Sequence, residues 1–343
     1  MVASAPRLLD AQNGVIEKNL RSPYTERWSF GFERQLPDNI LLDVSYVGSE
    51  SHKLTTRADL NPRLLNGQRL HPDFGLRYVR TSQGNSAYHA LQWRVDRRFA
   101  RGFQLAASYT WSRNIDSTSE GVGQVSGHEN LTSMSVVQGG LKLDRGLSDY
   151  DRAQRLAIVY IWAIPALRTA VLKYTLGGWS IAGITSFQTG APFTLQNGSD
   201  RNNDAIPSDR PDIGNSNVPL STRAVVFPRC ATGYQNPDTG ACVTPGDVRW
   251  VEGKGLPNAS TVGRNTLLAG GTNNFELSLS KSFPVGERRR LEFRWEALNA
   301  FNHPQFIQVP ERSVAGSPPS RFLNRDFTDS GIRSMWVQLK LIF

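Results

Sequence analysis

The chain has 343 residues, enough for one large domain or two ordinary ones. Its 39 Lys and Arg against 30 Asp and Glu give a net charge of +9, which favours an anionic partner, either nucleic acid or a membrane surface. The mean hydropathy of −0.39 excludes a helical membrane protein, and the longest apolar stretch, 156–167, is far shorter than the ~20 residues that a spanning helix needs. A membrane β-barrel stays compatible, because it alternates lipid-facing and lumen-facing residues.

The first twenty residues carry no secretion signal, since they contain no apolar core of the required length. A complete exported protein needs one, so the export hypothesis predicts that the chain lacks its beginning. We expect residues 1–24 to be the remnant of an external loop. The two cysteines, Cys230 and Cys242, lie close together in a turn-rich stretch, which suits one local disulfide in an oxidising compartment.

Period-2 alternation of apolar and polar residues recurs along the chain and predicts β-strands. The clearest segments are ILLDVSY (40–46), FQLAASYTW (103–111), NFELSLSKSF (274–283) and RLEFRWEALNAF (290–301). Nine strands are predicted near 26–36, 39–49, 87–99, 103–115, 153–164, 178–190, 273–283, 289–301 and 332–343. Their length of roughly ten residues matches tilted membrane-spanning strands and exceeds the usual five or six of soluble sheets.

The connections between these strands alternate between short and long. The short ones are LPDN, ARG, the segment around PALRT and PVGER, and the long ones cover about 50–86, 116–152, 191–272 and 302–331. A soluble sandwich has no reason to place every long loop at one end, whereas outer-membrane barrels have short periplasmic turns and long external loops. The fold class is therefore predicted to be all-β, an antiparallel meander forming part of a transmembrane β-barrel that is open as given.

Aromatic residues test this topology, because their rings favour the two membrane interfaces. If the chain ends in the periplasm, the external rim contains Trp28, Tyr46, Tyr109, Trp111, Phe187, Phe275 and Phe301. The periplasmic rim then contains Phe99, Phe103, Trp179, Phe283 and Phe343. The alternative is a general preference of aromatic residues for strands, but that preference does not explain their positions at strand ends.

Four motifs in order resemble the barrel of Oar-like TonB-dependent receptors: residues 22–54, DRAQRLAIVYIWAIP (151–165), GWSIAGITSFQTGAPFTL (178–195) and EFRWEALNAFNHPQF (292–306). The resemblance covers nearly the whole chain. It implies a signal peptide, a carboxypeptidase-regulatory-like β-sandwich, a plug and a 22-stranded barrel. Residues 1–343 correspond to the C-terminal part of that barrel, and the plug, the TonB box and the N-terminal domains are expected to be absent.

Catalytic motifs such as GxSxG, HExxH, a Walker loop or CxxC do not occur, so an enzyme is not predicted. The loop DRNNDAIPSDRPD carries Asp200, Asn202 and Asp204 at i, i+2 and i+4, the spacing of oxygen ligands around Ca²⁺, with Asp209 as a further ligand. Ala205 stands where such a loop prefers Gly. A solvated, turn-forming Asn/Asp segment is the alternative, and no other cofactor is expected.

Basic residues gather at the short-turn end in three groups, 97–101, 168–173 and 288–290. Outer-membrane lipid is the expected partner there, because anionic headgroups attract such residues; solvated turns are the alternative. Nucleic acid is not expected, since exposed aromatic residues do not alternate with these cations on one face.

The C-terminal segment has apolar residues at every second position up to an aromatic end, namely Met335, Val337, Leu339, Leu341 and Phe343. This pattern resembles the signal that barrel-assembly machinery reads in outer-membrane proteins, so that machinery is an expected partner. The TonB complex is expected to act only through the missing N-terminal regions.

The resemblance implies a receptor in the outer membrane of a Gram-negative cell that binds and imports an unidentified ligand. A passive porin or adhesin barrel shares every feature above. A soluble all-β carbohydrate-binding protein is a further alternative, as is an outer-membrane phospholipase, which needs a Ser–His pair that we do not find.

Overall fold

The computed structural model describes residues 15–75, 77–119, 140–165, 177–201, 209–253, 255, 261–286, 289–306, 309, 311–324 and 331–343. These residues form strands and three short 3₁₀ segments, η2 (Pro37–Asn39), η4 (Gly140–Lys142) and η5 (Pro245–Asp247). The long strands are β2 (Tyr24–Leu36), β3 (Ile40–Asp59), β4 (Tyr78–Ala100), β5 (Phe103–Asp116), β7 (Gln154–Ala163), β8 (Trp179–Gln188), β15 (Thr272–Val285), β16 (Arg289–Leu298) and β17 (Ser334–Ile342). In the described part of the chain, no helix combines the length and apolar character needed to span a membrane.

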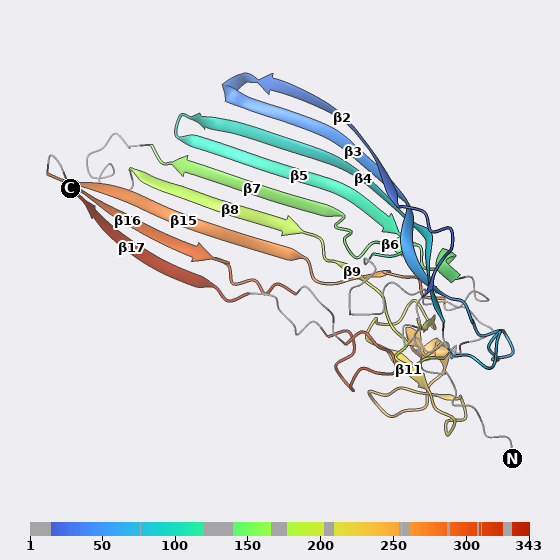
Figure 1. Ribbon diagram of the computed structural model, residues 1–343. Coiled ribbons are helices and arrows are strands. Elements are labelled where there is room, and N and C mark those ends of the chain that lie inside the picture. Colours follow the sequence, from blue (N-terminus) through green and yellow to red (C-terminus); the bar gives the residue numbers. More distant parts are fainter. Residues whose placement is uncertain are drawn as a thin grey trace, which may run out of the picture.

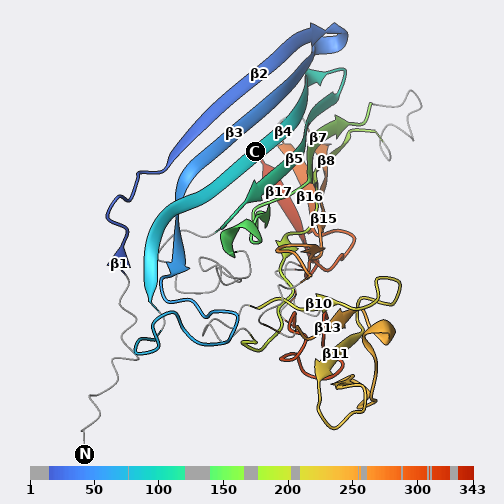
Figure 2. The same ribbon diagram turned by 90° about the vertical axis from the view of Figure 1, so that its right-hand side faces the viewer.

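The nine long strands form one sheet in chain order, β2-β3-β4-β5-β7-β8-β15-β16-β17, with every neighbouring pair antiparallel (Figure 1). Within this sheet β2 and β17 are the edge strands, and the described residues do not pair them with each other. Two further short strands attach to it: β1 (Val15–Ile16) pairs with β4, and β6 (Gly146–Leu147) pairs with β5. The predicted all-β antiparallel meander is confirmed, as an open curved sheet (Figure 2).

Cross-strand register brings the apolar residues of successive strands onto one side of the sheet. Leu279 of β15, for example, lies between Ile181 of β8 and Trp295 of β16, and Trp295 lies opposite Val337 of β17. Ser280 lies in the neighbouring register row, opposite Arg294. Because side chains alternate across a strand, these rows define two faces. We call the side that carries Leu279 the apolar face and the side that carries Ser280 the polar face.

The alternation of short and long connections places all long connections at one end (Figure 1). At one end the connections are 37–39, 101–102 and 286–288, which are short, and 164–178, which is longer than the sequence predicted. At the other end the connections are 60–77, 117–153, 189–271 and 299–333. The loop predicted at 50–86 is wrong over much of its length, since β3 continues to Asp59 and β4 starts at Tyr78, opposite it. We call the paired residues 52–59 of β3 and 78–85 of β4 the ribbon. The alternation of apolar and polar residues stops before the ribbon, because strands outside lipid meet water on both faces and need only their backbone pairing.

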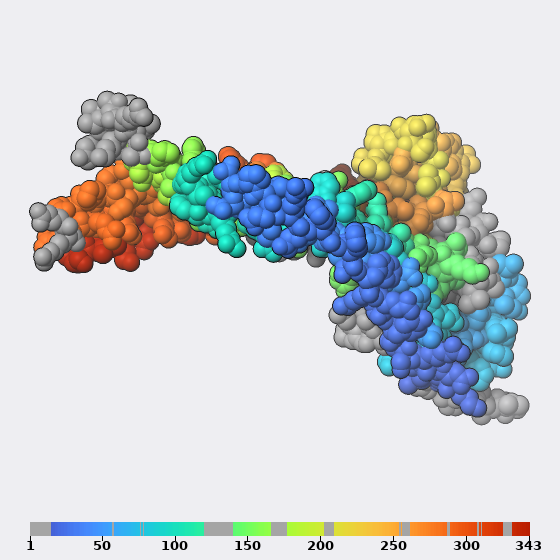
Figure 3. All heavy atoms as spheres, turned by 90° about the horizontal axis from the view of Figure 1, so that it is seen from above, coloured from blue at the N-terminus to red at the C-terminus, as the bar shows by residue number. Residues whose placement is uncertain are grey.

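Most of the buried apolar residues lie in the connections rather than in the long strands. Within 189–271 the chain forms β9 (Pro192–Phe193), β10 (Asp212–Ile213), β11 (Arg223–Val226), β12 (Tyr234–Gln235), β13 (Trp250–Val251) and β14 (Leu267–Leu268). These pair as a four-stranded sheet, β10-β13-β11-β12, and a two-stranded sheet, β14-β9. We call the described residues of 189–271 and 299–333 the cap. Figure 3 shows its yellow residues massed at one end of the thin layer formed by the long strands.

Candidate functional site

Three apolar clusters hold the cap together. The largest unites Leu195, Trp250 and Val262 from connection 189–271 with Val314 and Phe322 from connection 299–333. Because both connections contribute to one core, the cap is a single packed unit and not two independent loops. The other clusters consist of Ala224, Tyr234, Val248 and Val251, and of Phe193, Ala269 and Val309.

Arg223 of β11 is the principal polar link between the two connections, and its side chain is 0% exposed. Its Nε and Nη2 donate to the two carboxylate oxygens of Asp238 at 3.0 and 2.9 Å. Its remaining N–H groups donate to the carbonyls of Ser313, Val314 and Pro318 at 3.2, 2.9 and 3.1 Å. A guanidinium presents donors in a planar fork, so this arrangement fixes both connections in one geometry.

Asp238 receives a further hydrogen bond from the backbone N–H of Ser320 at 2.8 Å. Partial burial raises the pKa of the Asp238 carboxyl, but the hydrogen bonds from Arg223 and Ser320 and the charge of Arg223 lower it by more. The net pKa lies below its ordinary value, so the carboxyl is ionised at neutral pH and the link is charged.

Arg264 joins the cap to the neighbouring connection 117–153. Its guanidinium donates to Asp116 Oδ1 at 2.6 Å and to the carbonyls of Asp116 and Asp144, each at 3.0 Å. The adjacent Asn265 donates to the Leu147 carbonyl at 2.7 Å. Three of the long connections are therefore cross-linked at one end of the sheet, which gives this end a defined surface.

A cavity of about 520 Å³ lies beside this junction. Arg113, Arg145, Arg264 and Asp151 contribute its charged groups, and Leu268 is among its apolar ones. Arg113 forms an ion pair with Asp151, with 3.6 Å between Nη1 and Oδ2. The volume lies within the range of small-molecule sites, ~300–1,000 Å³. Most of the lining side chains are polar or charged. This cavity is the candidate ligand site.

The predicted calcium ligands are only partly described by the structure. Asn202 and Asp204 lie outside the described residues, while Asp200 and Asp209 lie within them. Asp209 is buried, with 6% of the residue exposed. Its carboxylate accepts a hydrogen bond from the backbone N–H of Arg201 at 2.6 Å. In the described ranges no three His, Cys, Asp or Glu residues gather as a metal site. Calcium at this loop stays a prediction.

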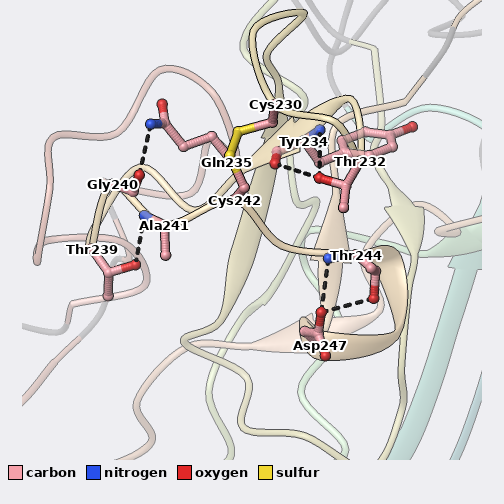
Figure 4. The surroundings of a disulfide bond; sticks show 10 residues. All are labelled: Cys230, Thr232, Tyr234, Gln235, Thr239, Gly240, Ala241, Cys242, Thr244 and Asp247. Carbon is pink, nitrogen blue, oxygen red and sulfur yellow. Dashed lines mark hydrogen bonds between the residues drawn. A yellow bond between two sulfur atoms is a disulfide. The ribbon is translucent and has the colours of Figure 1, made fainter.

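Cys230 and Cys242 are joined by a disulfide with 5.5 Å between their Cα atoms (Figure 4). The segment that they enclose contains β12, and Gln235 Nε2 donates to the Gly240 carbonyl at 2.8 Å. Just after it, the Thr244 backbone N–H and hydroxyl both donate to the Asp247 carboxylate at 2.8 Å. The backbone donor, followed by the hydroxyl, lowers the pKa of the Asp247 carboxyl. This corner of the cap is thus locally cross-linked.

The residues of the predicted assembly signal lie on the edge strand β17 and at its end. Met335, Val337, Leu339 and Leu341 oppose Ala297, Trp295, Phe293 and Leu291 of β16 on the apolar face. Leu339 and Phe343 are 65% and 82% exposed, so this strand presents its apolar side outward.

Some of the aromatic residues assigned to the two rims contact other rings near the ends of the strands, whereas Tyr46 and Tyr109 lie inside β3 and β5 rather than at their ends. At the loop end, Phe275 makes edge-to-face contacts with Phe187 and Phe301, at centroid distances of 5.4 and 4.9 Å. At the short-turn end, Trp179 makes an edge-to-face contact with Phe293 at 5.9 Å.

Sequence reasoning did not single out Arg223, Arg264 or Asn265. The apolar runs AVVF (224–227) and VRWV (248–251) inside a supposed loop were the available indication of a packed cap. The ion pairs had no such indication, because Arg264 lies far along the chain from Asp116 and only the fold brings them together.

A family model described as an outer membrane beta barrel domain matches residues 2–324. A search of curated protein sequences finds no match. Among solved structures, the outer membrane transporter YddB from Escherichia coli is similar, with TM-score 0.45, 10% identity and coverage of 94% of this chain and 33% of that one. The ferripyoverdine receptor of Pseudomonas aeruginosa has a TM-score of 0.41 and 10% identity, with coverage of 93% of this chain and 27% of that one. The copper transporter OprC has a TM-score of 0.39 and 9% identity, with coverage of 94% of this chain and 32% of that one. The chain thus spans about a third of the length of these structures.

Proposed function

The chain belongs to the outer membrane beta barrel domain family, and from this premise we propose that it is the C-terminal barrel portion of a TonB-dependent receptor that binds a ligand at its external loops and imports it. The outer membrane is its location, and the soluble carbohydrate-binding alternative is set aside by the family. The single observation that carries the proposal is the cross-linked cap beside the 520 Å³ cavity. A structured ligand-binding surface at the loop end suits a receptor better than a passive pore.

The position of each part of the molecule indicates its role in uptake. The cap and the cavity would select the ligand, and the strands would form the wall of the path through the membrane. Arg113, Arg145 and Arg264 favour a ligand with acidic or hydrogen-bond-accepting groups. Energy from TonB would act through regions that precede this barrel portion.

Uptake by intact cells tests the proposal. Periplasmic small molecules would be compared by mass spectrometry among wild-type cells, cells lacking the gene and cells lacking TonB. We expect at least one compound whose accumulation requires both. The same wild-type protein in a planar bilayer should conduct little current, because a plug fills the barrel of such receptors. Steady conductance together with accumulation that is independent of TonB would instead identify a passive porin.

A further inference from the structure

Four cations lie on the apolar face of the sheet near the short turns. By register their cross-strand neighbours include apolar residues: Arg34 opposes Leu42, Arg97 opposes Ile40 and Leu105, Lys281 opposes Trp179 and Phe293, and Arg289 opposes Val285. We call Arg34, Arg97, Lys281 and Arg289 the basic belt. They lie on four different strands, β2, β4, β15 and β16, rather than in one turn, so turn composition does not explain them.

Aromatic rings of the same face hold three of these cations. The Arg97 guanidinium lies 5.1 Å from the Phe103 ring centroid, and the Arg289 guanidinium lies 5.7 Å from that of Phe343. The Lys281 ammonium lies 5.2 Å from the Trp179 ring and 5.0 Å from the Phe283 ring. Such contacts favour a cation that is partly removed from water. Lys281 fits this description, since the residue is only 7% exposed. Its ammonium is enclosed by the two rings, so the more exposed Arg34, Arg97 and Arg289 present the charges that can contact headgroups directly.

The carboxylates of the same strand ends lie on the other side. Glu33 and Asp43 oppose each other across β2 and β3, Asp96 opposes Ala106, and Glu292 opposes Ser282 and Lys340, all on the polar face. The apolar face at this level is therefore a cationic surface with aromatic rings, while the polar face has mixed charge. A solvated surface gives no reason for this separation.

The location of the protein in a membrane explains why cations and carboxylates lie on different faces. The apolar face contacts lipid, and a cation there is costly unless it reaches the headgroup level, where phosphates lie. The short-turn end is where aromatic rings mark that interface. We propose that the basic belt binds the phosphate groups of phospholipids in the adjoining leaflet and selects anionic phospholipids over zwitterionic ones. A zwitterionic headgroup brings its own cation, so it gains less from Arg34, Arg97, Lys281 and Arg289.

The test measures lipids retained by the full-length protein in nanodiscs made of equal parts phosphatidylglycerol and phosphatidylcholine. After transfer to detergent, native mass spectrometry counts each lipid that stays bound. The belt variant combines Arg34→Gln, Arg97→Gln, Lys281→Gln and Arg289→Gln. The control removes as many charges from the polar face, through Arg94→Gln, Arg290→Gln, Arg294→Gln and Lys340→Gln.

Wild-type and control proteins should retain several-fold more phosphatidylglycerol than phosphatidylcholine, and the belt variant should lose that preference. Equal loss in the control, or no preference in the wild type, would overturn the proposal. Heat-modifiable migration in gels checks that each variant is folded. If the fourfold belt variant does not fold, Arg289→Gln alone is compared with Arg290→Gln, whose side chain is also exposed but lies on the polar face. A drop in phosphatidylglycerol that is equal in both counts against the belt.

Discussion

Neighbouring positions in β15 face opposite surroundings. Leu277 opposes Gly183 and Ala297 on the apolar face, whereas Ser278 opposes Ala182 and Glu296 on the polar face. Leu277→Arg places a charge in lipid and should cost ~2–4 kcal/mol if the position is near the bilayer midplane, and Ser278→Arg should cost far less. Reversible urea unfolding of the full-length protein in lipid vesicles measures both values. Equal costs would show that the two faces are wrongly assigned.

The charged link at Asp238 makes the cap sensitive to acid. Its folded pKa lies below the unfolded value of about 3.9, so the link contributes stability above that value and loses it as the pH falls through the folded pKa. We expect hydrogen exchange at 311–324 to be slow from pH 7 to 5 and to accelerate below about pH 4 relative to the intrinsic rate. Asp238→Asn, the control, should lose ~1–3 kcal/mol of cap stability at neutral pH and should flatten the acid response. An unchanged acid response in that variant would argue against this link.

At the scale of elements, the disulfide belongs to the cap and not to the sheet. Cys230 and Cys242 are separated by 12 positions, and closing such a segment is worth roughly 3 kcal/mol in the chain-entropy model. Cys230→Ser with Cys242→Ser should expose 228–244 to proteases while heat-modifiable migration of the barrel stays unchanged. Free thiols that titrate in the unreduced wild-type protein would refute the pairing.

The edge strand β17 is expected to guide assembly. Its apolar side chains are exposed, and none of the described strands pairs with its outer backbone edge, which could therefore pair with the barrel-assembly machinery. Deletion of Phe343 should lower the level of the protein in the outer membrane several-fold and leave synthesis and export unchanged. Phe343→Tyr, which keeps an aromatic end, should assemble at the wild-type level. Normal assembly of the deletion variant would contradict an aromatic signal.

Sequence alone predicted elements to the extent that lipid shaped them. The segment FQLAASYTW alternates because one face must be apolar, so β5 was found almost to the residue. The ribbon beyond Ser51 in β3 has no such requirement and was missed. The link from Arg223 to Ser313 spans 90 positions, and no local pattern records contacts of that range. The candidate site therefore needed the fold, while the sheet did not.

At the scale of the whole molecule, the sheet has two edges, and lipid tolerates neither because unpaired backbone groups are costly there. We expect the 343-residue chain, refolded alone in detergent, to associate through β2 and β17. Size-exclusion chromatography with light scattering should detect oligomers, and the full-length protein should be monomeric under the same conditions. A monodisperse monomer of the short chain would mean that it covers its own edges.

The ribbon formed by β3 and β4 extends beyond the loop ends of the other long strands. Pairing continues from Ser51↔Ser86 to Asp59↔Tyr78, and eight further residues at ~3.3 Å each extend it by roughly 25 Å. Its tip is a tight turn in which the Gly67 N–H donates to the Leu64 carbonyl at 2.8 Å. A peptide tag inserted at that turn would be displayed far from the lipid, where antibodies and bacteriophages first meet the cell. The ribbon would then be the first part of the protein that antibodies and bacteriophages contact, and its sequence would be under selection from them.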